Sequence, residues 1–336
     1  MIKVLYIGQC EEGSTSKMRF DVMSSLLNVK IDLINISDLI FSTNKIFRTL
    51  GWRFKIGPLI WRVNQLINYT ISQNDMYDLI WIDKGVFISF DTMRSIRLKS
   101  IKLVHFTPDP AFFYHKSRFF KKSLTLYDYC ITTKSFELSE YKRFGCQNLI
   151  YSPQCYDDLI HKPLYSFEEK VYDVCFIGHY EKERALILQY LIDNNLRVVI
   201  GGIKWSAFAK KNNDKNNLIY FGSHLAALDY SRVLSSSKIG LGLLSKWIPE
   251  KHTTRTFEIP ACGTLLATEL NDEIFSFFGN DVLYFTDSIN LLSQLNELLN
   301  NPLLLKSKII QQSIRLEKLQ RSYRESVHYN LQVIGL

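Results

Sequence analysis

Charged and polar side chains gather in the segment 250–269, where the sequence is best equipped to do chemistry. The segment begins with carboxylates and cations, continues through a Pro-Ala-Cys-Gly turn into a short apolar run, and ends at another carboxylate. This composition predicts a binding site built across the start of a helix and the strand that follows. Its candidate side chains are Glu250, Lys251, His252, Arg255, Glu258 and Glu269, with Gly263 at the turn.

Glu258 stands two residues before Pro260 and five before Gly263, a position expected near the start of a helix. A negative charge is favoured there, and a carboxylate can bind the two hydroxyls of a ribose through both oxygens. A capping role, in which Glu258 accepts from the first N–H groups of the helix, explains the residue equally well. The residue alone leaves both interpretations open.

Glycines follow two expected strands in the second half of the chain. Gly178 ends one apolar run, and the next helix carries Arg184; Gly202 repeats the arrangement after the next run. Glycine lets a ligand approach the backbone closely, and free N–H groups at a helix start attract a phosphate. A plain structural turn is the alternative interpretation of each glycine.

The elements that must position these residues are short apolar runs alternating with helical patterns, which predict parallel sheets covered on both faces. In such sheets, ligands bind at the carboxyl ends of the strands. We expect a first domain over 1–155, a linker over 156–171, a second domain over 172–310 and a C-terminal helix over 311–336 that could cross back to the first domain. The expected strands are Ile2–Ile7, Lys30–Ile34, Asp78–Ile82, Lys102–Phe106, Tyr129–Thr132, Asn148–Tyr151, Tyr172–Ile177, Arg197–Ile200, Leu218–Phe221, Ile239–Leu244, Thr264–Ala267 and Val282–Phe285.

Composition is that of an ordinary folded protein, because 46% of the 336 residues are hydrophobic and 22% are charged. The length suggests about two domains. The sequence has no stretch of about 18 uncharged apolar residues, the length that a membrane span requires. Its first residues lack the features of a signal peptide. The six cysteines show no metal-binding spacing, so we expect buried thiols in a reducing compartment.

The net charge of +8 is concentrated in the first half, where residues 1–160 contain 21 Lys and Arg against 15 Asp and Glu. Cations and aromatic residues are interleaved, without an acid, in 45–62, and again in 116–122. Such mixtures suit an anionic membrane surface or an acceptor that carries phosphate. A solvated helix face is the alternative, and no recognition motif favours nucleic acid. The cations of the first group are Lys45, Arg48, Arg53, Lys55 and Arg62.

The segment Thr254–Glu269 resembles the signature of GT-B glycosyltransferases of the group 1 type, and most closely that of the CgeB-like (spore maturation protein) family. Tyr172–Gly178 resembles the strand that opens the second domain of that family, and Asp128–Pro153 includes motifs similar to the end of its first. The resemblance implies an α/β fold of two Rossmann-like domains that face each other across a cleft. The second domain would hold a nucleotide-sugar and the first would hold the acceptor.

The resemblance also implies roles for single residues. The family often carries two glutamates separated by seven residues, as Glu250 and Glu258 are; the later one contacts the ribose of the nucleotide and the earlier one lies near the donor sugar. His179 and Arg184 stand where many members have Arg and Lys for the diphosphate, and Lys246 or Arg255 could add charge. The expected donor-binding residues are Gly178, His179, Arg184, Gly202, Lys246, Arg255, Glu258 and Gly263.

Glycosyl transfer needs positive charge near the departing diphosphate, which arginines and helix starts can supply. The chain contains no Asp-x-Asp pair for a metal ion, so we expect neither a metal nor another cofactor. Asp109 follows an expected strand of the first domain and is a candidate acceptor base or sugar contact, together with Glu250 as the catalytic residues. A turn residue between two prolines is the other interpretation of Asp109.

The favoured hypothesis is a glycosyltransferase that moves a sugar from a nucleotide-sugar to a cell-surface glycan, which could be a polysaccharide, a lipopolysaccharide or a glycoprotein. We expect it in the cytoplasm, on the inner face of the cell membrane through 45–62, with a glycan or lipid-linked acceptor as partner. The spacing of Glu250 and Glu258 favours retention of anomeric configuration by analogy. A nucleotide-sugar epimerase of the same fold and a non-catalytic binding or assembly protein are the alternatives.

Overall fold

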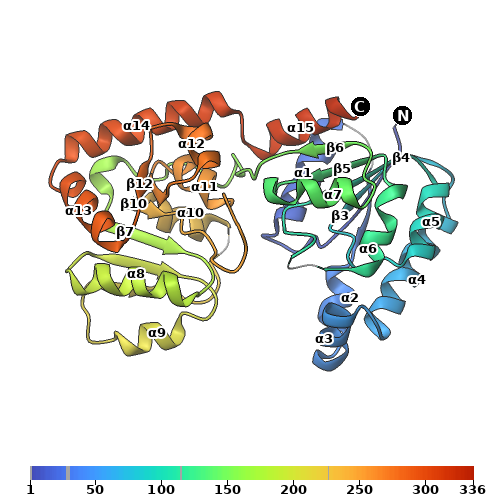
Figure 1. The fold of residues 1–336 in the computed structure, drawn as a ribbon, viewed down its shortest axis with the longest axis horizontal. Helices are drawn as coiled ribbons and strands as arrows, with labels where there is room; N and C mark the ends of the chain where they lie inside the picture. Colours follow the sequence, from blue (N-terminus) through green and yellow to red (C-terminus); the bar gives the residue numbers. More distant parts are fainter. Residues whose placement is uncertain (1, 28–30, 114–115, 226) are drawn as a thin grey trace. The chain divides into compact units, whose positions relative to one another are not determined.

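The structure, a computed structural model, describes residues 2–27, 31–113, 116–225 and 227–336 and divides into two compact units (Figure 1). Unit 1 comprises Met1–Pro153 and Tyr323–Leu336, and unit 2 comprises Gln154–Ser322. Each unit is a six-stranded parallel sheet with helices on both faces. The α/β prediction is therefore confirmed.

The unit 1 sheet has the strand order β2-β1-β3-β4-β5-β6. Its strands are β1 (Val4–Gly8), β2 (Ile31–Asn35), β3 (Tyr77–Asp83), β4 (Ser100–Thr107), β5 (Tyr129–Thr132) and β6 (Leu149–Tyr151). Its helices are α1 (Thr15–Leu27), α2 (Ser37–Ser42), α3 (Lys45–Phe54), α4 (Pro58–Ser72), α5 (Phe90–Leu98), α6 (Arg118–Ser123), α7 (Leu138–Arg143) and α15 (Tyr323–Val333), with 3₁₀ turns η1 (Leu124–Leu126) and η2 (Ser135–Glu137). Successive residues of each strand point to opposite faces of the sheet and form two hydrophobic cores. Helices α4 and α5 pack on one face, and α1 and α15 pack on the other.

The unit 2 sheet has the strand order β12-β11-β10-β7-β8-β9. Its strands are β7 (Tyr172–Ile177), β8 (Val198–Gly201), β9 (Leu218–Tyr220), β10 (Ser237–Leu241), β11 (Leu265–Glu269) and β12 (Leu283–Phe285). Its helices are α8 (Lys182–Asp193), α9 (Ser206–Lys211), α10 (Ala227–Ser235), α11 (Arg255–Ala261), α12 (Asp272–Phe278), α13 (Ser288–Leu299) and α14 (Pro302–Leu319), with a 3₁₀ turn η3 (Phe167–Glu169). Helices α8 and α13 cover one face, and α10, α11 and α12 cover the other.

The C-terminal tail differs from the single helical run that its periodicity predicts. Helix α14 ends at Leu319, the next residue, Gln320, has a left-handed φ of 50°, and α15 begins at Tyr323 as part of unit 1. Neither glycine nor proline marks the break in the sequence. All six cysteines are buried free thiols, as their apolar surroundings predict.

Candidate donor site

Two glycines draw the backbone together at the carboxyl edge of the unit 2 sheet. Gly202 has a φ of 117°, and a Cβ atom built on it would lie 2.3 Å from the carbonyl oxygen of Gly178, so a larger residue does not fit. The amide of Gly178 donates to the carbonyl of Gly201 over 3.0 Å, and Nε1 of Trp205 donates to the carbonyl of Gly178 over 2.8 Å. The loops after β7 and β8 therefore meet through main-chain atoms.

Two arginines lie beside this glycine contact and share the ring of Phe176. The guanidinium carbons of Arg184 and Arg255 are each 5.6 Å from the centroid of that ring. Nη1 of Arg255 would lie 3.1 Å from a Cβ atom on Gly178, so its guanidinium covers the loop. Arg184 is only 5% exposed, and burial together with the charge of Arg255 lowers its pKa to about 10. Two partly desolvated cations at one place attract an anion.

Protein groups satisfy this arginine pair only in part. Nη1 of Arg184 donates to the carbonyl of His179 over 2.9 Å and forms an ion pair with Glu181 over 3.0 Å. Nη2 of Arg255 donates to the carbonyl of Leu243 over 3.3 Å. The Nε atoms of both arginines are buried and find no hydrogen-bond acceptor in the described part of the chain. An anionic ligand at this edge would supply the acceptors that they lack.

Three carboxylates hold the loop that follows β10. The successive amides of residues 244–246 donate to Glu269, Glu250 and Glu181 respectively, each over 3.2 Å. Nζ of Lys246 forms an ion pair with Glu269 over 3.1 Å and keeps half of its side-chain surface exposed. Glu250 and Lys246 thus lie at the same sheet edge as the arginine pair, where the sequence predicts them.

Glu258 lies on α11 and is 8% exposed. The hydroxyl of Tyr230, on α10, donates to its Oε2 over 2.6 Å, and Nε2 of His161 lies 3.8 Å from its Oε1. Nδ1 of His161 accepts from the amide of Asp157 over 2.9 Å, so the proton of the neutral imidazole is on Nε2 and faces the carboxylate. Burial, and then the charge of Glu258, raise the pKa of Tyr230 well above its usual value. The carboxylate is thus held in one orientation.

His179 lies in the same loop as Gly178 and packs its ring edge-on to that of Trp247, with the centroids 6.4 Å apart. Burial, and then the charges of Lys204 and Arg184, lower its pKa below the usual value for histidine. A neutral imidazole is favoured beside these cations, so His179 can form hydrogen bonds to a phosphate without adding to the positive charge.

Gly263 is not brought to this edge. It follows α11 and precedes β11, which places it at the amino edge of the sheet. Its φ of 68° suits glycine, and a Cβ atom there would lie 3.2 Å from the ring of Pro163. Its geometry is explained by the turn that ends α11, where its amide donates to the carbonyl of Pro260 over 3.0 Å.

Asp109, in unit 1, follows β4 and remains 37% exposed at its side chain. Nζ of Lys84 forms an ion pair with its Oδ2 over 2.7 Å, and Lys84 has a left-handed φ of 68° at the end of β3. A non-glycine residue in this conformation is uncommon and is found more often at functional positions than elsewhere. The pair lies at the carboxyl edge of the unit 1 sheet, where the sequence places Asp109.

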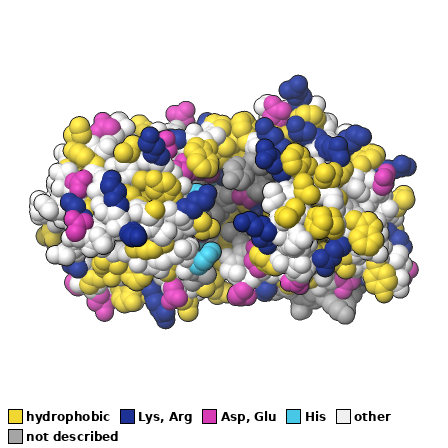
Figure 2. Space-filling model, turned by 90° about the horizontal axis from the view of Figure 1, so that it is seen from below, with side chains coloured by type: hydrophobic (Ala, Val, Ile, Leu, Met, Phe, Trp, Pro, Cys, Tyr) yellow, Lys and Arg dark blue, Asp and Glu magenta, His cyan; other side chains and the backbone are white. Residues whose placement is uncertain are grey.

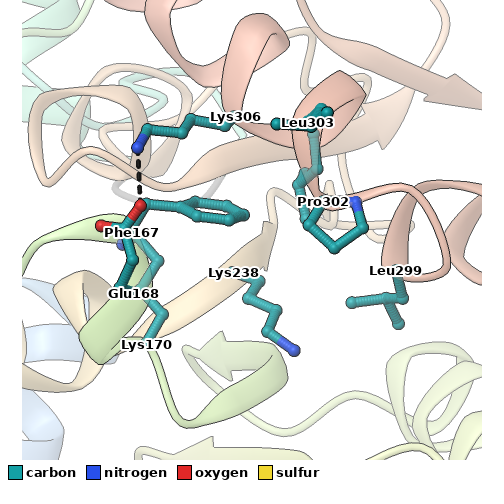
Figure 3. A pocket seen from close by; sticks show the side chains of 9 residues that line it. Phe167, Glu168, Lys170, Lys238, Leu299, Pro302, Leu303 and Lys306 are labelled. Atoms are coloured by element: carbon teal, nitrogen blue, oxygen red, sulfur yellow. Dashed lines mark hydrogen bonds and ion pairs between the residues drawn. The ribbon is translucent and has the colours of Figure 1, made fainter.

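The pocket in Figure 3 lies elsewhere in unit 2. It has a volume of about 420 Å³ and is lined by side chains from the starts of β10 and α14, among them Lys238, Pro302 and Lys306. The ion pair of Lys306 with Glu168, 2.6 Å long, closes one side of it. Since β10 begins at the amino edge of the sheet, this pocket is separate from the arginine pair.

Tyr230, His161 and Glu181 are site residues that sequence reasoning missed. Each touches a predicted residue across an element boundary, and no fixed spacing links Tyr230 to Glu258. Glu181 offered a signal, because it precedes the basic helix start that the sequence singles out. Within the described ranges there is no group of three His, Cys, Asp or Glu residues able to hold a metal ion, and no helix is long and apolar enough to span a bilayer.

The comparisons with known proteins agree with the two-unit fold. Residues 183–329 match the family described as glycosyl transferase-like. No curated protein matches the chain. Solved structures resemble nearly its whole length: sucrose-phosphate synthase from Thermosynechococcus elongatus has a TM-score of 0.69 at 11% identity and covers 99% of this chain and 98% of its own.

Two further solved structures resemble the chain over nearly its whole length. Anabaena HepE in complex with UDP-glucose has a TM-score of 0.67 at 11% identity, over 99% of this chain and all of its own. The β-glucosyltransferase of phage T4 has a TM-score of 0.60 at 15% identity, over the full length of both chains. At these identities the likeness shows the fold, and the prediction of a GT-B fold is confirmed.

Proposed function

We propose, from the premise that this chain is a GT-B glycosyltransferase, that it transfers a sugar from a nucleotide-sugar donor to a cell-envelope glycan without a metal ion. The observation that carries the proposal is the arginine pair beside Gly178 and Gly202, whose buried Nε atoms have no acceptor among the residues that the structure describes. HepE was solved with UDP-glucose, which supports a donor of this chemical class. Membership of the CgeB-like group is part of the proposal and rests on the segment Thr254–Glu269.

The arginine pair accounts for the leaving group. As the bond between the sugar and the diphosphate breaks, negative charge builds up on the phosphate oxygens, and fixed cations stabilise it. Arg184 and Arg255 supply two such charges, and His179 adds a neutral hydrogen-bonding group. Because the protein already holds these groups in place, little reorganisation is needed during the reaction.

Glu258 would bind the ribose of the donor. Tyr230 uses one lone pair of its carboxylate, and a carboxylate offers about four. The remaining sites can accept from the two ribose hydroxyls, while Tyr230 and His161 keep the group from rotating. Glu250 would lie near the donor sugar, and the family analogy favours retention of the anomeric configuration.

The acceptor side of the proposal rests on Asp109 and Lys84. A carboxylate paired with an ammonium at a sheet edge can orient a sugar hydroxyl and accept its proton. A polysaccharide, lipopolysaccharide, glycoprotein or lipid-linked glycan would suit an enzyme of the cytoplasm that works at the inner face of the cell membrane. Nucleic acid is not among the proposed partners.

A charge-removing variant tests the donor site. R255Q should need at least about tenfold more nucleoside diphosphate than the wild type to reach the same thermal shift, and should lose transfer from nucleotide-sugars, because a charge-assisted contact to phosphate is removed. R232Q is the matched control, since Arg232 is an exposed arginine of the same unit. The measurements are thermal shifts with a panel of nucleoside diphosphates and product analysis. Equal diphosphate binding by R255Q and the wild type would count against the proposal.

A further inference from the structure

Six large apolar side chains are exposed in a short stretch of unit 1 that runs from the end of α2 through α3 to the start of α4. Together they form what we call the α3 surface: Phe41 (64% exposed), Ile46 (71%), Phe47 (40%), Phe54 (53%), Ile56 (47%) and Trp61 (64%). Figure 2 shows yellow side chains interleaved with dark-blue ones on unit 1, at its right. Soluble proteins seldom expose so many large apolar side chains together unless the surface binds something.

Helix α3 is turned so that its apolar stripe faces away from the core. Gly51 is buried, and a Cβ atom there would lie 2.8 Å from the side chain of Leu59 on α4. The ring of Trp52 lies 4.6 Å from that of Phe87, so this side holds the helix to unit 1. Ile46 and Phe54, eight residues apart, lie on another side of the helix and are exposed, the reverse of an ordinary surface helix.

The helix is held firmly at both ends, so the exposure is not that of a frayed segment. Asn44 caps it, accepting from the amide of Phe47 over 3.0 Å. Lys55 ends it in a left-handed conformation, with a φ of 57° and its amide donating to the carbonyl of Gly51 over 3.1 Å. Pro58 then starts α4. The apolar side chains are therefore presented by ordered backbone.

Cations surround the apolar stripe, and acids are missing from it. The sequence contains no Asp or Glu between residues 39 and 74. Lys45, Arg48 and Arg53 lie on α3 itself, and no ion pair engages them within the described ranges. Lys55 does not join them: it is 5% exposed, its ammonium donates to the carbonyl of Trp52, and burial lowers its pKa. The expectation that Lys55 faces an anionic surface is wrong.

From this arrangement we infer that the α3 surface inserts its apolar side chains among the headgroups of an anionic lipid bilayer, with Lys45, Arg48 and Arg53 contacting the lipid phosphates. Aromatic and aliphatic side chains ringed by Lys and Arg are the composition that binds at this depth. A second copy fits poorly, because a two-fold contact would bring these cations against themselves. The inference deepens the membrane part of the proposed function, and lipid binding needs no donor.

Vesicle binding by the full chain tests it. The wild type should sediment with phosphatidylglycerol–phosphatidylcholine vesicles, and its tryptophan emission should shift to shorter wavelength; F54S/W61S should need at least about tenfold more lipid. I289S/L303S, which removes two apolar side chains of unit 2 that are more exposed than Phe54 and Trp61, should bind as the wild type does. Circular dichroism checks that each variant is folded.

The outcomes separate this mode from its rivals. Salt screens charge attraction but not apolar insertion. A substantial part of the vesicle binding should therefore survive in about 0.5 M NaCl at the same lipid concentration. If F54S/W61S bound vesicles as tightly as the wild type, or if the wild type lost all binding in salt, charge attraction alone would explain the binding. Either result would overturn the inference. If light scattering gave the molar mass of a dimer for the wild type and of a monomer for F54S/W61S, the α3 surface would instead bind a second copy of the chain. Donor thermal shifts are unaffected by any of these results, so a failure here is distinct from failure of the transferase proposal.

Discussion

At the scale of single residues, Glu258 depends on two side chains that are themselves buried. Tyr230 donates to it over 2.6 Å, and the protonated nitrogen of His161 faces its other oxygen. A carboxylate at 8% exposure that had neither contact would bury oxygen atoms without these partners, and it would be free to rotate. The two contacts thus hold the carboxylate in a fixed orientation, which the proposed ribose contact would require.

Y230F tests this dependence, because it removes one hydroxyl and keeps the ring. Losing a hydrogen bond to a charged group costs about 1.5–3 kcal/mol, so we expect donor KM to rise by roughly tenfold to a hundredfold. The comparison variant is Y329F, which changes an exposed tyrosine of α15. Steady-state kinetics with a nucleotide-sugar give the answer. A donor KM in Y230F equal to that of Y329F would mean that Tyr230 does not position Glu258 for the donor.

The same scale shows what the sequence could provide. Gly178, Gly202 and Arg184 could be placed at one edge because the rule for parallel sheets locates strand ends without knowing any distance. Tyr230 could not, because its contact with Glu258 depends on how α10 packs beside α11. Gly263 was grouped with the site because it stands close to Glu258 in sequence, whereas a helix carries it to the opposite sheet edge.

At the scale of elements, the loop after β4 is held in place by Glu137 of η2. This carboxylate is fully buried and accepts from the amides of Ala111 and Phe112 over 2.8 and 2.7 Å. The hydroxyl of Thr133 donates to the carbonyl of Pro108 over 2.9 Å, on the other side of Asp109. The loop that carries Asp109 is therefore shaped by the segment that follows β5 later in the chain.

We predict that E137A lowers the free energy of unfolding by about 3 kcal/mol, since it leaves two buried amides without an acceptor. E140A, on the next helix, removes a carboxylate whose nearest arginine nitrogen is 3.9 Å away, and should cost less than about 0.5 kcal/mol. Denaturant unfolding followed by circular dichroism measures both. Similar midpoints for the two variants would show that the loop amides find other acceptors.

The sequence pattern predicts the strands but not the break between α14 and α15. Alternating apolar runs located the strands of both sheets, because burial on two faces leaves an unbroken apolar signal. The break between α14 and α15 carried no such signal: Gln320 adopts a left-handed conformation although Gly or Asn is usual there. What fixes the break is the distant packing of α15 on α1, which local sequence does not encode.

At the scale of the whole molecule, the chain ends in the unit where it began. Val327, Leu331 and Ile334 are each at most 2% exposed and pack in the core of unit 1 with Val4 and other residues of its sheet. Unit 1 is thus completed only after unit 2 has been synthesised. The stability of unit 1 should depend on α15, whereas donor binding should depend on unit 2.

L331A separates these dependences. Truncating a buried leucine costs about 2–5 kcal/mol, so the unfolding transition of unit 1 should fall to a lower temperature, while V333A, at an exposed position of the same helix, should change it little. A nucleoside diphosphate stabilises only the unit that binds it, so in calorimetry it should raise the other transition in the wild type and in L331A alike. A single transition whose temperature both L331A and the diphosphate change would show instead that the two units unfold together. The packing of α15 in unit 1 would then contribute to the stability of the donor site in unit 2.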